Sequence, residues 1–216
     1  MNYFAHYYFD QKDQNPLYNF GLLLPDLLRN YSKNTYNKRI LHYENSSEIF
    51  RGAQQHFLRD KLFHQHIFFE RIQQNIYKSV KSTFEKYNIQ RYWFGIHVII
   101  ELILDKYLIY NNLIFLDKFY KDIEYAITTD LNWLKIIEHN DPQTFINSMK
   151  RFCEFRFLNK YTEAGGTMIG LNKIYQFVKA NGSDWTENTN LWAELLKLEN
   201  IIYVEVSSNY YLLQEP

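Results

Sequence analysis

The sequence predicts an all-α protein of one domain. Two observations predict the helices, and a third predicts the single domain. Only 7 Gly and 4 Pro occur among 216 residues, so few positions favour breaking a helix. Apolar residues over most of the chain recur at i, i+3, i+4 and i+7, which is the spacing of one helix face. No repeat, low-complexity tract or clear linker divides the chain. We therefore expect a single helical domain over residues 1–216.

The first helix is predicted over residues 16–29, because proline suits the first position of a helix. Pro25 lies inside this helix and predicts a kink or a break just before Asp26. The polar, turn-rich segment that follows, residues 30–47, predicts a loop or a short helix.

The middle of the chain predicts three further helices. Ser46 or Ser47 can cap a long helix over residues 48–76, because serine side chains accept hydrogen bonds from the first free backbone N–H groups. A second helix is expected over 77–86. The third, over 93–110, is apolar on nearly every face, which predicts that it is buried.

The last third continues the helical pattern. Residues 115–140 contain at least one amphipathic helix, and another begins at Pro142 behind an aspartate cap and extends to about residue 159. A helix over 163–180 ends at the turn sequence Asn181-Gly182. The segment from Ile201 onward is ambiguous, since "IYVEV" alternates as a strand does while continuing a helical run.

Composition excludes several classes of protein. Lys and Arg number 24 and Asp and Glu 24, so no net charge favours nucleic acid or an anionic membrane. One cysteine allows no intramolecular disulfide and no cysteine-based zinc site. Charged residues interrupt the longest apolar run, which disfavours a membrane span, and the first residues do not resemble a signal peptide. We expect a cytoplasmic protein.

Two stripes of metal-ligand side chains stand out. His56, Asp60 and His64 recur at i, i+4 and i+8, and so do His97, Glu101 and Asp105, so each set lies along one side of a helix. The alternatives are a solvated face for the first stripe and a buried salt bridge for the second. Carboxylates in a buried helix are costly unless they are paired or bind metal. Facing stripes could hold one or two divalent cations.

Two isolated polar residues add to this picture. Asp26 is a lone acid within "LLLPDLL", where it could be a metal ligand or a helix cap after the proline. His6 is a lone polar residue in "NYFAHYYF", and such a histidine is more often a core group.

The order of the motifs along the chain resembles that of the acyl carrier protein phosphodiesterase family, whose members are relatives of the HD-type metal-dependent phosphohydrolases. "MNYFAHYYF" is similar to its opening Met-Asn-aromatic-Leu-Ala-His motif, and "GLLLPDLLRN" to its Gly-Asn-x-x-x-Asp segment. "GAQQHFLRDKLFHQH" and "RYWFGIHVIIELILDKYL" match its His…Asp and Asp-x-x-x-Asp-His patterns. "FLNKYTEAGGTMIGLNKIYQF" matches a later segment. The matches follow the family's order over most of the chain.

The resemblance implies a divalent-metal site, with Mn or Mg first and Fe as the alternative. It implies hydrolysis of the phosphodiester that joins 4′-phosphopantetheine to acyl carrier protein. The implied metal ligands are His56, Asp60, Asp105, His64 and Asp26. The implied catalytic residues are Asp26, Asp60 and Glu101, and the implied substrate-binding residues are Arg29, Arg59 and Lys106.

Five substitutions separate the chain from the family pattern. Leu22, Phe57, His64 and Lys106 stand where the family has Asn, Arg, Asp and His, and Glu101 stands where it has a shorter Asp. Lys106 is then expected to neutralise Asp105 or to hold a phosphate, since an ammonium cannot ligate metal. Two other classes of protein fit these residues: a helical di-iron or di-manganese carboxylate protein, and a non-catalytic interaction protein that keeps the fold.

Overall fold

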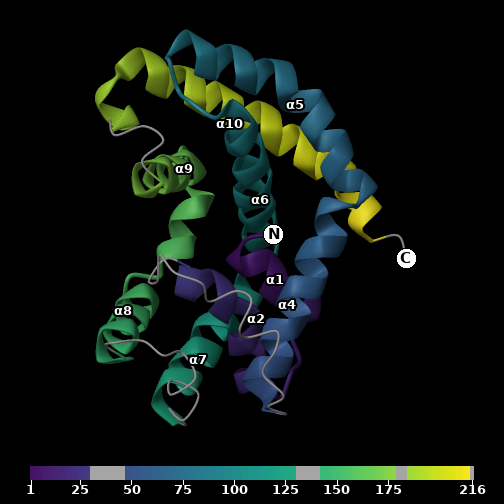
Figure 1. The fold of residues 1–216 in the computed structure, drawn as a ribbon, viewed down its shortest axis with the longest axis vertical. Helices are drawn as coiled ribbons and strands as arrows, with labels where there is room; N and C mark the ends of the chain where they lie inside the picture. Colours follow the sequence, from purple (N-terminus) through teal and green to yellow (C-terminus); the bar gives the residue numbers. More distant parts are fainter. Residues whose placement is uncertain (30–46, 130–141, 179–183, 215–216) are drawn as a thin grey trace. The chain divides into compact units, whose positions relative to one another are not determined.

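The all-α prediction is confirmed. The computed structural model describes residues 1–29, 47–129, 142–178 and 184–214, and within these ranges all regular structure is helical, with no strand (Figure 1). The chain divides into two compact units. Unit 1 comprises Met1–Leu62 and Asn112–Phe157, and unit 2 comprises Phe63–Asn111 and Leu158–Pro216. A single domain over residues 1–216 stays a prediction.

Unit 1 is built on helix α2, which packs against α1 and α7, while α7 also packs against α8. Its centre is aromatic: Phe4, Phe20 and Phe119 are fully buried, and Tyr7 meets Phe119 edge to face at 5.3 Å between ring centroids. Such aromatic pairs bury large apolar areas and fix the angle between helices. The helices of this unit are α1 (Tyr3–Asp10), α2 (Pro16–Arg29), most of α4 (Glu48–His64), α7 (Leu113–Thr129) and α8 (Pro142–Glu154).

A buried polar network ties three of these helices together. Asp122 on α7 accepts hydrogen bonds from the Tyr7 hydroxyl and the Asn19 amide, both at 2.7 Å, and from Lys118 at 3.2 Å. A buried carboxylate is tolerated when its lone pairs are satisfied in this way. The network holds α1 on α2 and α7, and so fixes the position of His6, the neighbour of Tyr7.

Unit 2 surrounds α6, which packs against α5, α9 and α10, and α5 and α10 run alongside one another (Figure 1). The burial predicted for residues 93–110 is confirmed on most of α6. Even so, no helix of the described ranges is long and apolar enough to cross a membrane. The elements are α5 (Ile67–Lys86), α6 (Tyr92–Asn111), η2 (Phe157–Thr162), α9 (Gly166–Phe177), η3 (Trp185–Glu187), α10 (Thr189–Asn209) and η4 (Tyr210–Leu213).

The predicted helices over 48–76 and 77–86 have the wrong boundary, because the first breaks at residues 65–66 and α5 (Ile67–Lys86) continues through residues 76–77. Helix α4 ends at His64 and α5 begins at Ile67. The His66 ring caps α5, its Nδ1 accepting a hydrogen bond from the Phe68 backbone N–H at 3.2 Å. No glycine or proline marks this break in the sequence, so a side-chain cap sets it.

Other boundaries follow the sequence more closely. Helix α2 spans residues 16–29 as predicted, but it continues through Pro25, so the expected break before Asp26 is wrong. The ambiguous segment after Ile201 is helical as far as residue 209, which rejects the strand alternative. The predicted loop or short helix over 30–47, except for residue 47, and the Asn181-Gly182 turn lie outside the described residues.

The single thiol is expected to be nearly inert. Cys153 on α8 is 4% exposed, and burial raises its pKa to about 12. Because only the thiolate alkylates rapidly, Cys153 of the folded protein should react with iodoacetamide at pH 8 about 1,000-fold more slowly than a free cysteine. Mass spectrometry over time measures the rate, and the urea-unfolded protein is the control. Alkylation within tenfold of the unfolded rate would contradict the buried position.

Candidate metal centre

Two glycines bring α2 and α4 into backbone contact. A Cβ atom added to Gly52 would overlap the Tyr18 carbonyl oxygen and lie 2.9 Å from the Gly21 Cα. A Cβ added to Gly21 would likewise overlap the Ile49 carbonyl oxygen. Only residues without a side chain permit this approach. The crossing places the helical turn of α2 that follows Gly21 against the helical turn of α4 that follows Gly52. The candidate ligands Asp26 and His56 lie close to these two turns.

Three ligand-type side chains meet at this crossing. His6 of α1, Asp26 of α2 and His56 of α4 each offer one ligand atom, and these atoms lie within 4.8 Å of one another. The two imidazoles stack with ring centroids 3.7 Å apart, and His56 Nε2 lies 3.9 Å from Asp26 Oδ1. This last distance is too long for a hydrogen bond. It suits two ligands of one ion, which lie roughly 3–4 Å apart when each bonds at about 2.1 Å.

The backbone of α2 fixes the tautomer of His56. Its Nδ1 lies 2.8 Å from the Leu22 carbonyl oxygen, which can only accept, so Nδ1 carries the proton and Nε2 keeps a lone pair when the ring is neutral. Histidines that bind metal usually donate their second N–H in this way.

Burial keeps the His6 imidazole neutral. It is fully buried, and neither ring nitrogen has a partner of ordinary hydrogen-bond geometry among the described residues. Burial lowers the pKa of His6 well below its usual value, and the neighbouring His56 lowers it further. A buried polar ring without a partner is costly unless a ligand satisfies it. Neutral imidazole is the form that binds metal.

Two of the predicted residues border this group. Asp60 Oδ1 lies 3.9 Å from His6 Nε2 and 2.5 Å from the Met1 amino nitrogen. The neighbouring Arg59 guanidinium binds Asp10 through two hydrogen bonds of 2.6 and 2.8 Å. Asp60 is therefore placed beside the centre, whereas two donors of the Arg59 fork are already engaged by a carboxylate.

Four of the predicted site residues belong to unit 2, namely His64, Glu101, Asp105 and Lys106, and only Arg29 remains to be placed. His64 and Glu101 meet with His97 in a second group of ligand-type side chains. Asp105 is fully buried on α6 and belongs to neither group. Lys106 forms an ion pair of 3.1 Å with the buried Glu199. The side chain of Arg29 lies outside the described residues.

Sequence reasoning did not assign His6 as a ligand. His6 is buried, as expected of a core histidine, and it also stacks on His56. The signal that could have identified it is its position at the end of the "MNYFAH" motif. The alternative of a helix cap for Asp26 is wrong, because Asp26 lies inside the continuous helix α2.

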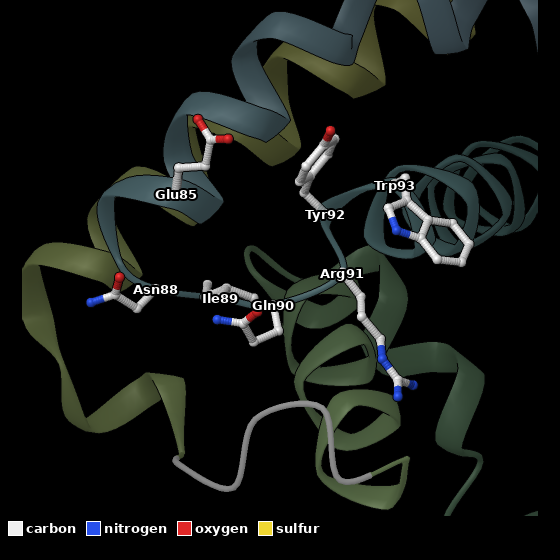
Figure 2. Close-up of a pocket in the computed structure, with 7 residues that line it drawn as sticks. All are labelled: Glu85, Asn88, Ile89, Gln90, Arg91, Tyr92 and Trp93. Carbon is white, nitrogen blue, oxygen red and sulfur yellow. The ribbon is translucent and has the colours of Figure 1, made fainter.

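A surface pocket is lined by none of the predicted site residues. It follows the turn between α5 and α6, where Arg91 and Trp93 are among the residues that line it (Figure 2). It contributes nothing to the metal centre.

Comparison with known proteins gives no relative. No protein-family model, no curated protein and no solved structure matches the chain. The structure nevertheless contains groupings of His, Asp and Glu that could hold a metal ion.

Proposed function

We propose that the protein is a metal-dependent phosphodiester hydrolase that resembles the acyl carrier protein phosphodiesterases. One observation carries the proposal. The motif segments "MNYFAH", "GLLLPD" and "GAQQH" belong to three different helices, and their polar residues His6, Asp26 and His56 meet within 4.8 Å. Three polar side chains from separate motif segments therefore share one small volume.

His6, Asp26 and His56 would hold the metal. The donor set fits, since His6 is buried with no partner of ordinary hydrogen-bond geometry among the described residues and the Leu22 carbonyl orients His56. Two imidazoles with one carboxylate suit Mn²⁺, Fe²⁺ or Zn²⁺ better than Mg²⁺, because Mg²⁺ prefers oxygen ligands. When bound, such an ion polarises a phosphoryl oxygen and lowers the pKa of a bound water.

The residues around the centre supply the rest of the reaction. Asp60, with a side chain 38% exposed, would take the proton of the attacking water. Water would add to phosphorus, the bond from phosphorus to the serine oxygen would break, and Asp60 would return the proton to the leaving serine oxygen. The single carboxylate of the group favours hydrolysis over the di-iron alternative, since di-iron sites of helical bundles gather about four carboxylates.

The implied partner, acyl carrier protein, is small and acidic, so it should bind next to basic residues. A run of basic residues follows Asp26 in the sequence: Arg29, Lys33, Lys38 and Arg39. Opposite charges on two such surfaces would speed their association and weaken it at high salt.

The direct test is release of phosphopantetheine. Chelator-treated protein is reloaded with Mn²⁺ or Mg²⁺ and incubated with holo-acyl carrier protein, and intact-mass spectrometry follows conversion to the apo form. We expect conversion with Mn²⁺, less with Mg²⁺ and none in the presence of EDTA. Failure to convert the substrate at saturating Mn²⁺ would refute the proposal.

A further inference from the structure

The second group of ligand-type side chains lies wholly in unit 2. His97 and Glu101 stand four residues apart on one face of α6, and His64 is the last residue of α4. Glu101 Oε1 lies 3.2 Å from His97 Nε2 and 3.4 Å from His64 Nε2. The two histidine rings stack with centroids 4.2 Å apart. Two imidazole nitrogens and one carboxylate oxygen therefore converge on a single point.

Packing holds both rings in this orientation. The Phe69 ring, in the first turn of α5, meets His64 at 4.8 Å and His97 at 5.1 Å between centroids, edge to face in both cases. Phe69 occupies this place because helix α4 ends at His64 and helix α5 begins at Ile67. The helix break that the sequence did not predict thus orders the group before any ligand arrives. A site with fixed ligands binds metal at a smaller entropic cost.

The group is also open to an ion from solvent. The side chain of Glu101 is 15% exposed, that of His64 24% and that of His97 42%. Partial burial strengthens the attraction between the carboxylate and a cation, and the exposed edge leaves room for water in a fourth position.

We propose that His64, His97 and Glu101 form a second metal site, which binds zinc or an ion of similar preference such as Co²⁺ or Ni²⁺. Two imidazoles and a carboxylate, ordered on helices with one position open, match the donor set and coordination number of zinc. None of these three residues belongs to the group proposed for hydrolysis. The inference assigns a site to unit 2 and does not depend on the proposed reaction.

Zinc titration of the full chain labelled with ¹⁵N-histidine tests the site. The Nε2 resonances of His64 and His97, assigned by substitution, should shift together as one equivalent of Zn²⁺ is bound. His97→Gln should weaken zinc binding at this site, read from the Nε2 resonance of His64, by at least about 100-fold, because the loss of a direct ligand costs more than the 10–100-fold typical of outer contacts. Unshifted ring nitrogens, or unchanged affinity in His97→Gln, would overturn the inference.

Two further variants make the test specific. His66→Asn removes an imidazole two residues from His64 but keeps a good helix cap, so its zinc affinity should equal that of the parent. If His97→Gln fails to fold by circular dichroism, Glu101→Gln serves in its place, with the same expected loss. Asp26→Asn removes the carboxylate proposed for hydrolysis and should leave the shifts of His64 and His97 intact. Loss of these shifts in Asp26→Asn would also count against a separate site.

Discussion

Asp26→Asn is expected to abolish Mn²⁺-dependent release of phosphopantetheine, lowering kcat/KM by about 1,000-fold or more. Asp26 supplies the only carboxylate of the group it forms with His6 and His56. Asparagine keeps the volume of the side chain and removes its charge, so the loss reports on electrostatics rather than packing. A metal ion contributes several kcal/mol to a phosphoryl transition state, and about 4 kcal/mol corresponds to 1,000-fold.

Steady-state kinetics with holo-acyl carrier protein and a Mn²⁺ titration measure this effect. The matched control is Asp13→Asn, the same chemical change at an exposed position, which should retain the parent activity. Activity of Asp26→Asn within tenfold of the parent would show that the reacting group lies elsewhere. Mn²⁺ bound with unchanged affinity by Asp26→Asn would remove Asp26 from the ligand set.

Gly52→Ala is expected to destabilise the protein by about 3 kcal/mol, because the added methyl group would strike backbone rather than a movable side chain. The new Cβ would overlap the Tyr18 carbonyl oxygen and lie 2.9 Å from the Leu22 backbone nitrogen. To relieve the overlap, α2 and α4 must separate. Separation would also move His56 away from Asp26 and the Leu22 carbonyl, so metal affinity should fall together with stability.

Urea unfolding followed by circular dichroism measures the free energy of unfolding of this variant. Gly170→Ala is the matched control, since the nearest atom to its new Cβ lies 3.4 Å away on the Tyr161 ring. This substitution should be neutral or stabilise the helix by up to about 1 kcal/mol. An equal, small effect of both substitutions would mean that α2 and α4 do not meet through their glycines.

The sequence alone was sufficient for the helical class and for several boundaries. The apolar spacing and the low glycine and proline content predicted helices, and Pro16 marked the start of α2. The uniformly apolar pattern of residues 93–110 predicted the burial of α6. These features follow from local preference and periodicity, which neighbouring residues in the chain determine.

The break after His64 shows what local preference leaves open. Residues 65–66 contain neither glycine nor proline, and the apolar pattern continues across them. The His66 cap on Phe68 and the packing of Phe69 on two histidine rings decide the boundary. Such contacts depend on residues far along the chain, such as His97, so no short window of sequence contains them.

Part of the candidate site could likewise be predicted from the sequence, and part required the tertiary structure. The sequence by itself determined which residue types were present: His56 and Asp26 as candidate ligands, and two stripes of histidine and carboxylate at helical spacing. Only the tertiary structure decided the grouping, joining His6 to His56 in unit 1 and His97 to His64 in unit 2. The physical reason is that helical spacing fixes neighbours on one helix. Partners on different helices are set by close approach between backbones, here the contact of Gly21 with Gly52.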